Sequence, residues 1–124
     1  MGKIVLQEND RDILEVLTAA LEMEGFDVYA ILSLDESILK IINKTRPHIV
    51  VLDYRLSGKD CIDICYKIKA ANPHLPVVAI SCNTNIQEQY SQGGFDGYIE
   101  KPFDLDLLFQ VLHTHIKESG PAKS

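Results

Sequence analysis

The sequence contains no apolar run that approaches the roughly 18 residues a transmembrane helix needs. It also lacks internal repeats, low-complexity segments and linkers, and its first residues lead directly into an expected strand rather than into a signal peptide. We therefore expect a single cytoplasmic domain over residues 1–118, with no membrane association. Residues 119–124 form a short polar tail that is too small to fold alone.

Positive charge is scarce, and the cysteines have no regular spacing. Twelve Lys and Arg residues stand against 18 Asp and Glu, which gives a net charge of −6. Nucleic acids are bound mainly through clustered Lys and Arg, so direct contact with DNA is not expected. The odd number of cysteines indicates a reducing compartment, in which Cys61, Cys65 and Cys82 act as small apolar residues rather than as metal ligands.

The apolar residues, 46% of the chain, fall into short runs that alternate with helical patterns. Continuous runs at residues 4–6, 49–52 and 77–80 predict buried strands, whereas residues 26–30 alternate as a half-buried edge strand does. A short last strand is expected around residues 98–99. Five strands alternating with five helices predict an α/β fold, a doubly wound parallel sheet in the order 2-1-3-4-5 with helices on both faces.

Local capping signals set the expected helix boundaries. Asp10 caps a helix over about 10–24 that Gly25 ends. Ser33 and Glu36 form a capping box ahead of the second helix, and Asp104 caps the last one. The expected buried positions are Ile13, Leu17, Ala20 and Leu21 in the first helix, Leu34, Ile38, Ile41 and Ile42 in the second, Ile62, Cys65, Tyr66 and Ile68 in the third, and Leu105, Leu108, Leu112 and Ile116 in the last.

Polar side chains that could serve a phosphoryl centre stand at the ends of four expected strands. Glu8 and Asn9 follow the first strand, Asp53 ends the third, Ser81 follows the fourth, and Lys101 follows the last. The carboxyl ends of parallel strands meet at one edge of a sheet, where open α/β folds bind their ligands. Each residue alone has an ordinary explanation, such as a helix cap or a solvated charge. Their joint placement favours a common site.

A carboxylate such as Asp53 can attack phosphorus only if the repulsion between the two negative groups is cancelled. A divalent cation, an ammonium group and a hydroxyl donor would together cancel it. Mg²⁺ prefers oxygen ligands and keeps several waters. Glu8, Asp53 and the backbone carbonyl of Arg55 are the ligands we expect for it.

Four segments, residues 3–10, 50–58, 79–81 and 97–103, carry a resemblance that extends over nearly the whole chain. The sequence resembles the receiver domains of two-component response regulators, which have a CheY-like (βα)5 fold of three layers. The resemblance implies that Asp53 is the phosphoacceptor. It puts Glu8 and Asn9 in the places of the acidic pair that binds Mg²⁺.

The resemblance also implies roles for residues near the last two strands. The Ser81 hydroxyl would bond the phosphoryl group, and Lys101 would contact its oxygens. Tyr98 would be the aromatic switch residue, which turns inward when Ser81 moves toward the phosphate. The peptide bond between Lys101 and Pro102 is expected to be cis, as it usually is in this family.

The chain departs from the family pattern at some site positions. The family normally has Asp where this chain has Asn9, so we expect Mg²⁺ to bind more weakly than is typical, with Glu8 as the chief acidic partner of Asp53. Cys82 follows Ser81 where a smaller residue is common, and its thiol could narrow access to the pocket. Arg55 and Asn83 occupy positions that govern how water reaches the acyl phosphate, and so are expected to set its lifetime.

The resemblance implies a phosphorelay receiver that takes a phosphoryl group from a sensor histidine kinase or a phosphotransfer protein. It would catalyse only its own phosphorylation and dephosphorylation, and so would not be a conventional enzyme. We expect it to stand alone and to signal to a downstream protein through the fourth helix (within residues 83–92), the fifth strand and the fifth helix. The sequence leaves open whether the chain forms a homodimer.

Three alternative functions are weighed against this one. Asn9 motivates the first, a pseudo-receiver that uses the same fold as a protein-interaction module without phosphorylation. A hydrolase with Asp53 as nucleophile is disfavoured, because Arg55 stands where such enzymes usually carry a second Asp. An FMN carrier is also disfavoured, because the first strand leads into an acidic turn, residues 8–10, where a phosphate cradle would be needed.

Overall fold

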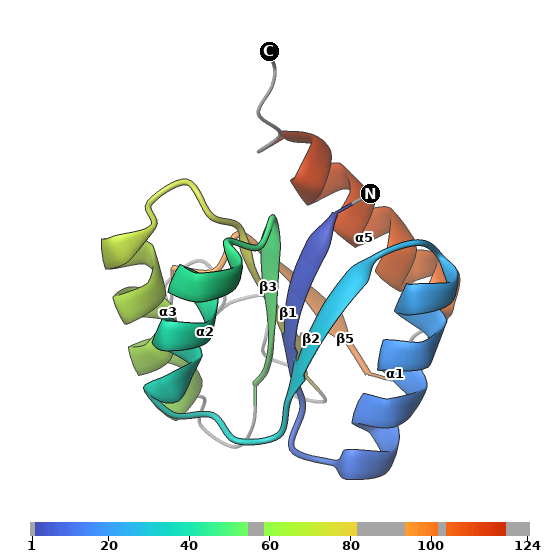
Figure 1. Cartoon of the computed structure of the whole chain (residues 1–124), viewed down its shortest axis with the longest axis horizontal. Helices are drawn as coiled ribbons and strands as arrows, with labels where there is room; N and C mark the ends of the chain where they lie inside the picture. The colour runs from blue at the N-terminus through green and yellow to red at the C-terminus, as the bar shows by residue number, and fades with distance from the viewer. Residues whose placement is uncertain (1, 55–58, 82–93, 102–103, 119–124) are drawn as a thin grey trace.

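The computed structural model describes residues 2–54, 59–81, 94–101 and 104–118 (Figure 1). Its strands form one parallel sheet in the order β2-β1-β3-β4-β5, as predicted. The strands are β1 (Lys3–Gln7), β2 (Asp27–Ile31), β3 (Ile49–Asp53), β4 (Val77–Ser81) and β5 (Gly97–Glu100). The fold class predicted from the sequence is therefore confirmed.

Helices cover both faces of this sheet (Figure 1). They are α1 (Arg11–Met23), α2 (Ser37–Thr45), α3 (Lys59–Ala71) and α5 (Leu105–Glu118). α1 and α5 lie on one face, and α2 and α3 lie on the other. The fourth helix expected within residues 83–92 and the polar tail at 119–124 lie outside the described residues. None of the described helices has the length and hydropathy that a membrane crossing requires.

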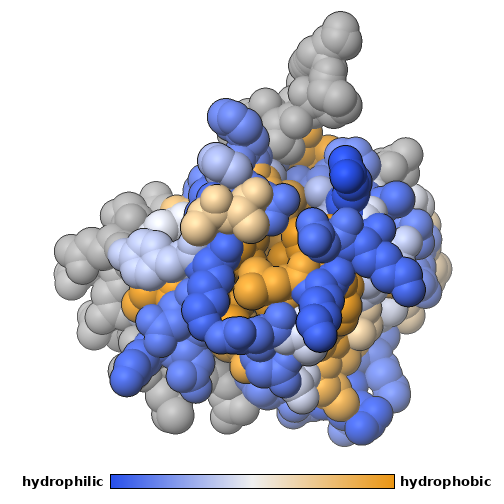
Figure 2. Space-filling view, turned by 60° about the vertical axis from the view of Figure 1, so that its left-hand side comes forward, coloured by the Kyte–Doolittle hydropathy of each residue, from blue (hydrophilic) through white to orange (hydrophobic). Residues whose placement is uncertain are grey.

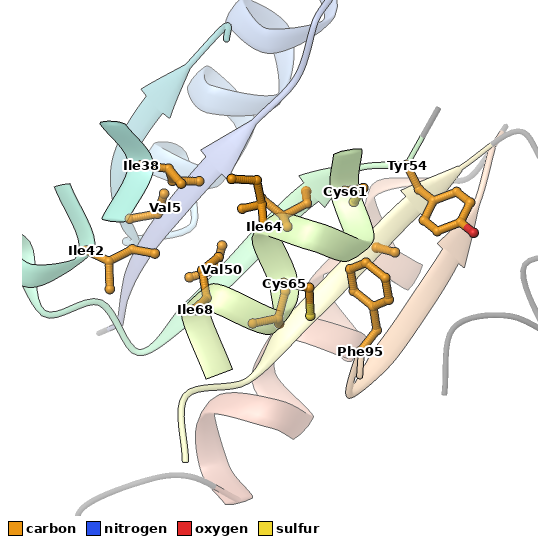
Figure 3. Close-up of a cluster of buried hydrophobic side chains, with 13 residues drawn as sticks. Val5, Ile38, Ile42, Val50, Tyr54, Cys61, Ile64, Cys65, Ile68 and Phe95 are labelled. Atoms are coloured by element: carbon orange, nitrogen blue, oxygen red, sulfur yellow. The ribbon is translucent and has the colours of Figure 1, made fainter. Parts of the chain in front are cut away.

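The core consists of two apolar clusters, one on each face of the sheet. Every residue of β3 and β4 is buried, because central strands of a parallel sheet are covered on both sides. Successive residues alternate between the clusters: Val50 and Leu52 pack toward α2 and α3, whereas Val51 packs toward α1 and α5. Figure 3 shows the cluster under α2 and α3, where the rings of Phe95 and Tyr54 lie with their centroids 5.8 Å apart.

β2 is an edge strand, as predicted, but its burial does not alternate as expected. Ala30 is exposed, although the sequence pattern assigns it to the buried face. Val28 packs against one apolar cluster and Tyr29 against the other. Because helices lie on both faces of the sheet, both sides of this strand gain partial cover.

The predicted cap of α1 is confirmed, but its predicted buried stripe is partly wrong. Asp10 accepts hydrogen bonds from the backbone N–H groups of Asp12 and Ile13, and Gly25 ends the turn at φ 100°. Ile13 is 39% exposed, and the described stripe is Leu14, Leu17 and Leu21. One residue corresponds to about 100° around a helix, so the buried face is rotated from the predicted one at the first turn.

The predicted capping box of α2 is wrong. The helix begins at Ser37, and Glu36 at its N-cap makes no side-chain capping bond. Asp35 instead accepts a hydrogen bond of 2.9 Å from the Ser37 backbone N–H. Glu36 forms an ion pair with Lys67 of α3, so its carboxylate does not reach back to Ser33. Asp35 rather than Ser33 therefore accepts from a backbone N–H at the start of this helix.

The two remaining helices each have one predicted core residue that is exposed. Tyr66 of α3 is 54% exposed, while Ile64 of the same helix is buried. Leu105, in the first turn of α5, is 39% exposed. The Asp104 cap is confirmed by a bond of 2.8 Å from the Leu107 N–H to its carboxylate. Buried residues predicted correctly are Cys65, Ile68, Leu108 and Leu112.

The face that carries α2 and α3 has an apolar centre framed by hydrophilic side chains (Figure 2). A groove of about 560 Å³ lies where these helices end and the strands β3 and β4 begin. Its lining includes Ile42, Arg46, His48 and Leu75. The groove lies at the amino edge of the sheet, opposite the edge where the sequence places the candidate site.

Candidate functional site

The sheet register brings the ends of the central strands to one edge, where the candidate site lies. Glu8 directly follows β1, and its backbone N–H donates to the Ile31 carbonyl at 3.0 Å. Asp53 is the last residue of β3 and pairs with Ile80 of β4. Lys101 directly follows β5, and its N–H donates to the Ser81 carbonyl at 2.7 Å. Backbone bonds therefore fix the positions from which these side chains project.

Lys101 lies between the two acidic residues of the site. Its Nζ is 3.2 Å from Glu8 Oε1 and 3.5 Å from Asp53 Oδ1. Glu8 is 2% exposed and Asp53 is 5% exposed, so water screens their charges poorly. Within this group, two carboxylates face one ammonium. The structure thus confirms that the residues predicted from three separate strands come together.

The two carboxylate oxygens of Asp53 have different surroundings. Asn9 donates to Oδ2 from its backbone N–H at 3.3 Å and from its side-chain Nδ2 at 3.1 Å. Oδ1 faces the ammonium group of Lys101. Because the Oδ2 lone pairs accept two hydrogen bonds, the two oxygens are chemically distinct before any ligand binds.

The fold shifts the pKa of Glu8. Burial raises the pKa of its carboxyl above the ordinary value, and repulsion by Asp53 raises it further. A hydrogen bond of 3.2 Å from the Asp10 N–H, together with Lys101, acts in the opposite direction. The net rise in pKa means that the fold disfavours the ionised form of Glu8, chiefly through burial and further through the neighbouring carboxylate. A bound cation would favour that form.

The donors at this edge fit a hard divalent cation such as Mg²⁺. Glu8 and Asp53 provide carboxylate oxygens, and Mg²⁺ is commonly held by one or two carboxylates together with water and phosphate oxygens. Among the described residues there is no group of three or more His, Cys, Asp or Glu that could hold a metal. Asn9 directs its amide nitrogen toward Asp53, so its carboxamide would have to turn to offer oxygen to a metal.

The other predicted site residues are only partly described. Ser81 is 1% exposed at the end of β4. Tyr98 is half-buried in β5 and packs against the cluster under α2 and α3. The predicted site residues Arg55, Asn83 and Pro102, and Cys82 beside Ser81, lie outside the described residues. Three expectations therefore stay predictions. They are the Arg55 carbonyl as a metal ligand, the influence of Arg55 and Asn83 on the lifetime of the acyl phosphate, and the cis peptide bond before Pro102.

Gln7 contacts the site and was not singled out from the sequence. Its side chain is buried, and its Oε1 accepts a bond of 3.2 Å from the Asp53 N–H. Its Nε2 donates to the Leu32 carbonyl at 2.9 Å. The available signal was a polar residue at the end of an otherwise apolar buried strand. Such a residue needs a hydrogen-bonding partner, but the sequence does not say which one.

Cys61 and Cys65 lie one turn apart in the apolar cluster under α2 and α3 (Figure 3). Both are buried free thiols. Burial raises the pKa of the Cys65 thiol to about 12, and raises the pKa of Cys61 as well. Because the thiolate is the reactive form, both are unreactive near neutral pH. Their packing agrees with the prediction that they act as small apolar residues.

Comparison with known proteins gives one family. The sequence profile described as "Response regulator receiver domain" matches residues 4–113. The DNA-binding response regulator MtrA of Mycolicibacterium smegmatis is 31% identical, in a match that covers 98% of this chain and 54% of MtrA. The chain spans about a quarter to about half of the length of the curated relatives it matches.

Solved structures show the same fold. NtrX from Brucella abortus, solved in complex with ATP, has a TM-score of 0.81 and 31% sequence identity. The match covers 95% of this chain and 27% of NtrX. TrrA from Thermotoga maritima, solved in complex with Mg²⁺-BeF, has a TM-score of 0.80 at 20% identity, covering 93% of this chain and 99% of TrrA. At that identity, the likeness to TrrA concerns the fold alone.

Proposed function

Since this chain belongs to the response regulator receiver domain family of two-component systems, we propose that it accepts a phosphoryl group on Asp53. The observation that carries the proposal is the position of Lys101 Nζ, within 3.5 Å of both Glu8 and Asp53 in a largely buried group. A buried acidic pair with one cation is poorly neutralised by itself. It is well suited to bind a metal ion and a phosphoryl group together.

In the proposed reaction, Asp53 Oδ1 is the attacking oxygen. Both hydrogen bonds from Asn9 go to Oδ2, whereas Oδ1 faces Lys101. A new bond forms between this oxygen and phosphorus, and the bond from phosphorus to the donor's nitrogen or oxygen breaks. The donor leaves with the electron pair of that bond. Lys101 offsets negative charge on the phosphoryl oxygens as they approach.

Mg²⁺ is the cofactor we propose, with Glu8 and Asp53 as its protein carboxylates. When bound, it would neutralise the acidic pair and the incoming phosphoryl oxygens. The Mg²⁺-BeF complex of TrrA supports this choice by analogy of fold. Asn9 contributes no negative charge and directs its amide nitrogen toward Asp53. We therefore propose that Mg²⁺ binds more weakly here than at a site with a third carboxylate.

We propose a sensor histidine kinase or a phosphotransfer protein as the phosphodonor, and a downstream protein as the receiver of the signal. The net charge of −6 favours protein partners over nucleic acid. The proposed output surface includes β5 and α5, and Tyr98 of β5 packs against the apolar cluster under α2 and α3. The rest of that surface, within residues 83–92, lies outside the described residues. The reaction is self-catalysed and cytoplasmic in this proposal.

Phosphorylation by labelled acetyl phosphate tests the proposed function. We expect wild type to be labelled with Mg²⁺ and not after chelation, and Asp53→Asn to remain unlabelled. Asp27→Asn, which changes an exposed carboxylate at the opposite edge of the sheet, is the matched control and should be labelled as wild type. A folded wild-type protein that shows neither labelling nor binding of beryllofluoride would support the pseudo-receiver instead.

A further inference from the structure

Gln7 is the only polar side chain pointing from the buried stretch of β1 into the fold. The three preceding residues, 4–6, are apolar and fully buried, and Gln7 itself is 1% exposed. Burying a carboxamide costs free energy unless both its oxygen and its nitrogen find partners. Both do so here, and one partner is the backbone of Asp53.

The side-chain oxygen of Gln7 adds one hydrogen bond between β1 and β3 beyond the end of their backbone pairing. The register between β1 and β3 ends at the pair Leu6 and Val51, so the Asp53 N–H lies beyond the last paired residue. Gln7 Oε1 accepts from this N–H at 3.2 Å. On the β4 side, the Tyr54 N–H donates to the Ile80 carbonyl at 2.8 Å. The backbone at Asp53 and Tyr54 is thus held from both neighbouring strands.

The nitrogen of Gln7 holds a second segment. Nε2 donates at 2.9 Å to the carbonyl of Leu32, which lies between β2 and α2. The neighbouring Glu8 N–H donates to the Ile31 carbonyl at 3.0 Å. One side chain therefore connects the end of β3, which carries the acceptor, with the segment that leaves β2.

We propose that Gln7 is a positioning residue for phosphoryl transfer. By fixing the Asp53 backbone where the β1–β3 ladder has ended, it directs the carboxylate so that Oδ1 faces Lys101 and Oδ2 faces Asn9. This inference rests on the proposed function of Asp53. It assigns no contact between Gln7 and the reacting group, because the side chain acts through the backbone of Asp53.

The side-chain chemistry explains why glutamine suits this position. Glutamate could accept from the Asp53 N–H but could not donate to Leu32, and it would add a third carboxylate beside Glu8. Asparagine is shorter by one methylene group. Methionine has nearly the same length and volume but would leave the Asp53 N–H and the Leu32 carbonyl without this partner.

Gln7→Met is therefore the test, with Val5→Ala as the matched control. Val5 lies on the same face of β1 and is fully buried, so its truncation destabilises the same strand without touching Asp53. For wild type and both variants, the maximal rate of phosphorylation is measured with Mg²⁺ at saturating acetyl phosphate. The free energy of unfolding of each protein is measured as well. We expect Gln7→Met to lower the maximal rate by about tenfold or more, since small misplacements of reacting groups are costly.

The control separates positioning from general stability. Val5→Ala should lower stability while leaving the maximal rate within about twofold of wild type. Equal rates in wild type and folded Gln7→Met would overturn the inference while leaving the proposed function intact. Failure of wild type to react would instead overturn the proposed function.

A second measurement decides the matter if Gln7→Met does not fold. In the wild-type protein, the Asp53 amide hydrogen should exchange with solvent as slowly as that of Tyr54, and one Gln7 side-chain amide hydrogen should also be protected. Fast exchange at Asp53 in the folded protein would show that Gln7 does not hold this group. That result would overturn the inference.

Discussion

Among single residues, Asn9 bears most directly on metal binding. Its side chain and backbone both donate to Asp53 Oδ2, so it partly satisfies that carboxylate in the absence of a cation. An aspartate there could not donate from its ionised side chain and would add a third negative charge near Glu8. In the proposed function, Asn9 would therefore favour the metal-free site over the metal-bound one.

Asn9→Asp should tighten Mg²⁺ binding, measured by calorimetric titration. The added carboxylate raises the attraction for the cation, and an increase in affinity on the order of tenfold corresponds to about 1.4 kcal/mol. Asn43→Asp makes the same chemical change on the exposed side of α2 and should leave the affinity unchanged. Unaltered affinity in Asn9→Asp would contradict the account of this residue.

The raised pKa of Glu8 predicts how the stability of the metal-free protein varies with pH. Its pKa is raised in the folded protein, so the folded state holds this proton more tightly than the unfolded chain does. The contribution of Glu8 to stability is then largest below its ordinary pKa and is lost as the pH rises through the raised value. Glu8→Gln should remove that loss and stabilise the metal-free protein at neutral pH relative to wild type.

Denaturant unfolding of wild type and Glu8→Gln across this pH range, with chelator present, checks the prediction. Glu15→Gln, an exposed change on α1, is the matched control and should follow wild type. The same pKa shift predicts that Mg²⁺ affinity of wild type falls as Glu8 gains its proton. A difference in stability between wild type and Glu8→Gln that does not vary with pH would count against this assignment.

At the scale of elements, the start of α1 links helix stability to the site. Asp10 caps the helix through its carboxylate, and its own N–H donates to Glu8. Asp10→Ala should lower the free energy of unfolding by about 1 kcal/mol, because two backbone N–H groups lose their partner. Asp12→Ala, two residues later in the first turn and without a capping bond, should cost less. Equal losses in the two variants, measured by urea unfolding, would show that Asp10 does not act as the cap.

Elements differ in how far the sequence predicts them. Strands such as β3 and β4 are predicted well, because continuous burial on both faces leaves an uninterrupted apolar run. Helix faces are predicted less well: Ile13 and Tyr66 are apolar enough for the core, yet both are exposed. The capping box of Ser33 and Glu36 is absent because α2 begins only at Ser37, where Asp35 accepts from the Ser37 N–H. Glu36 pairs with Lys67, which is distant in sequence, and local patterns do not contain such a contact.

At the scale of the whole molecule, topology is what makes the site predictable. Glu8, Asp53 and Lys101 are far apart in the chain, but a parallel sheet in the order 2-1-3-4-5 places the ends of β1, β3 and β5 at one edge. Residue type and strand position were therefore enough to predict their proximity. Gln7 was not predictable in the same way, since its role depends on where the ladder between β1 and β3 ends.

The most direct test of the central claim locates the phosphoryl group on the chain. Protein treated with acetyl phosphate and Mg²⁺ is trapped with borohydride, which reduces an acyl phosphate to an alcohol, and its peptides are sequenced by mass spectrometry. We predict reduction at Asp53 alone, and none after chelation of the metal. Reduction at Glu8, Asp10 or another carboxylate, with Asp53 unmodified in folded protein, would contradict it.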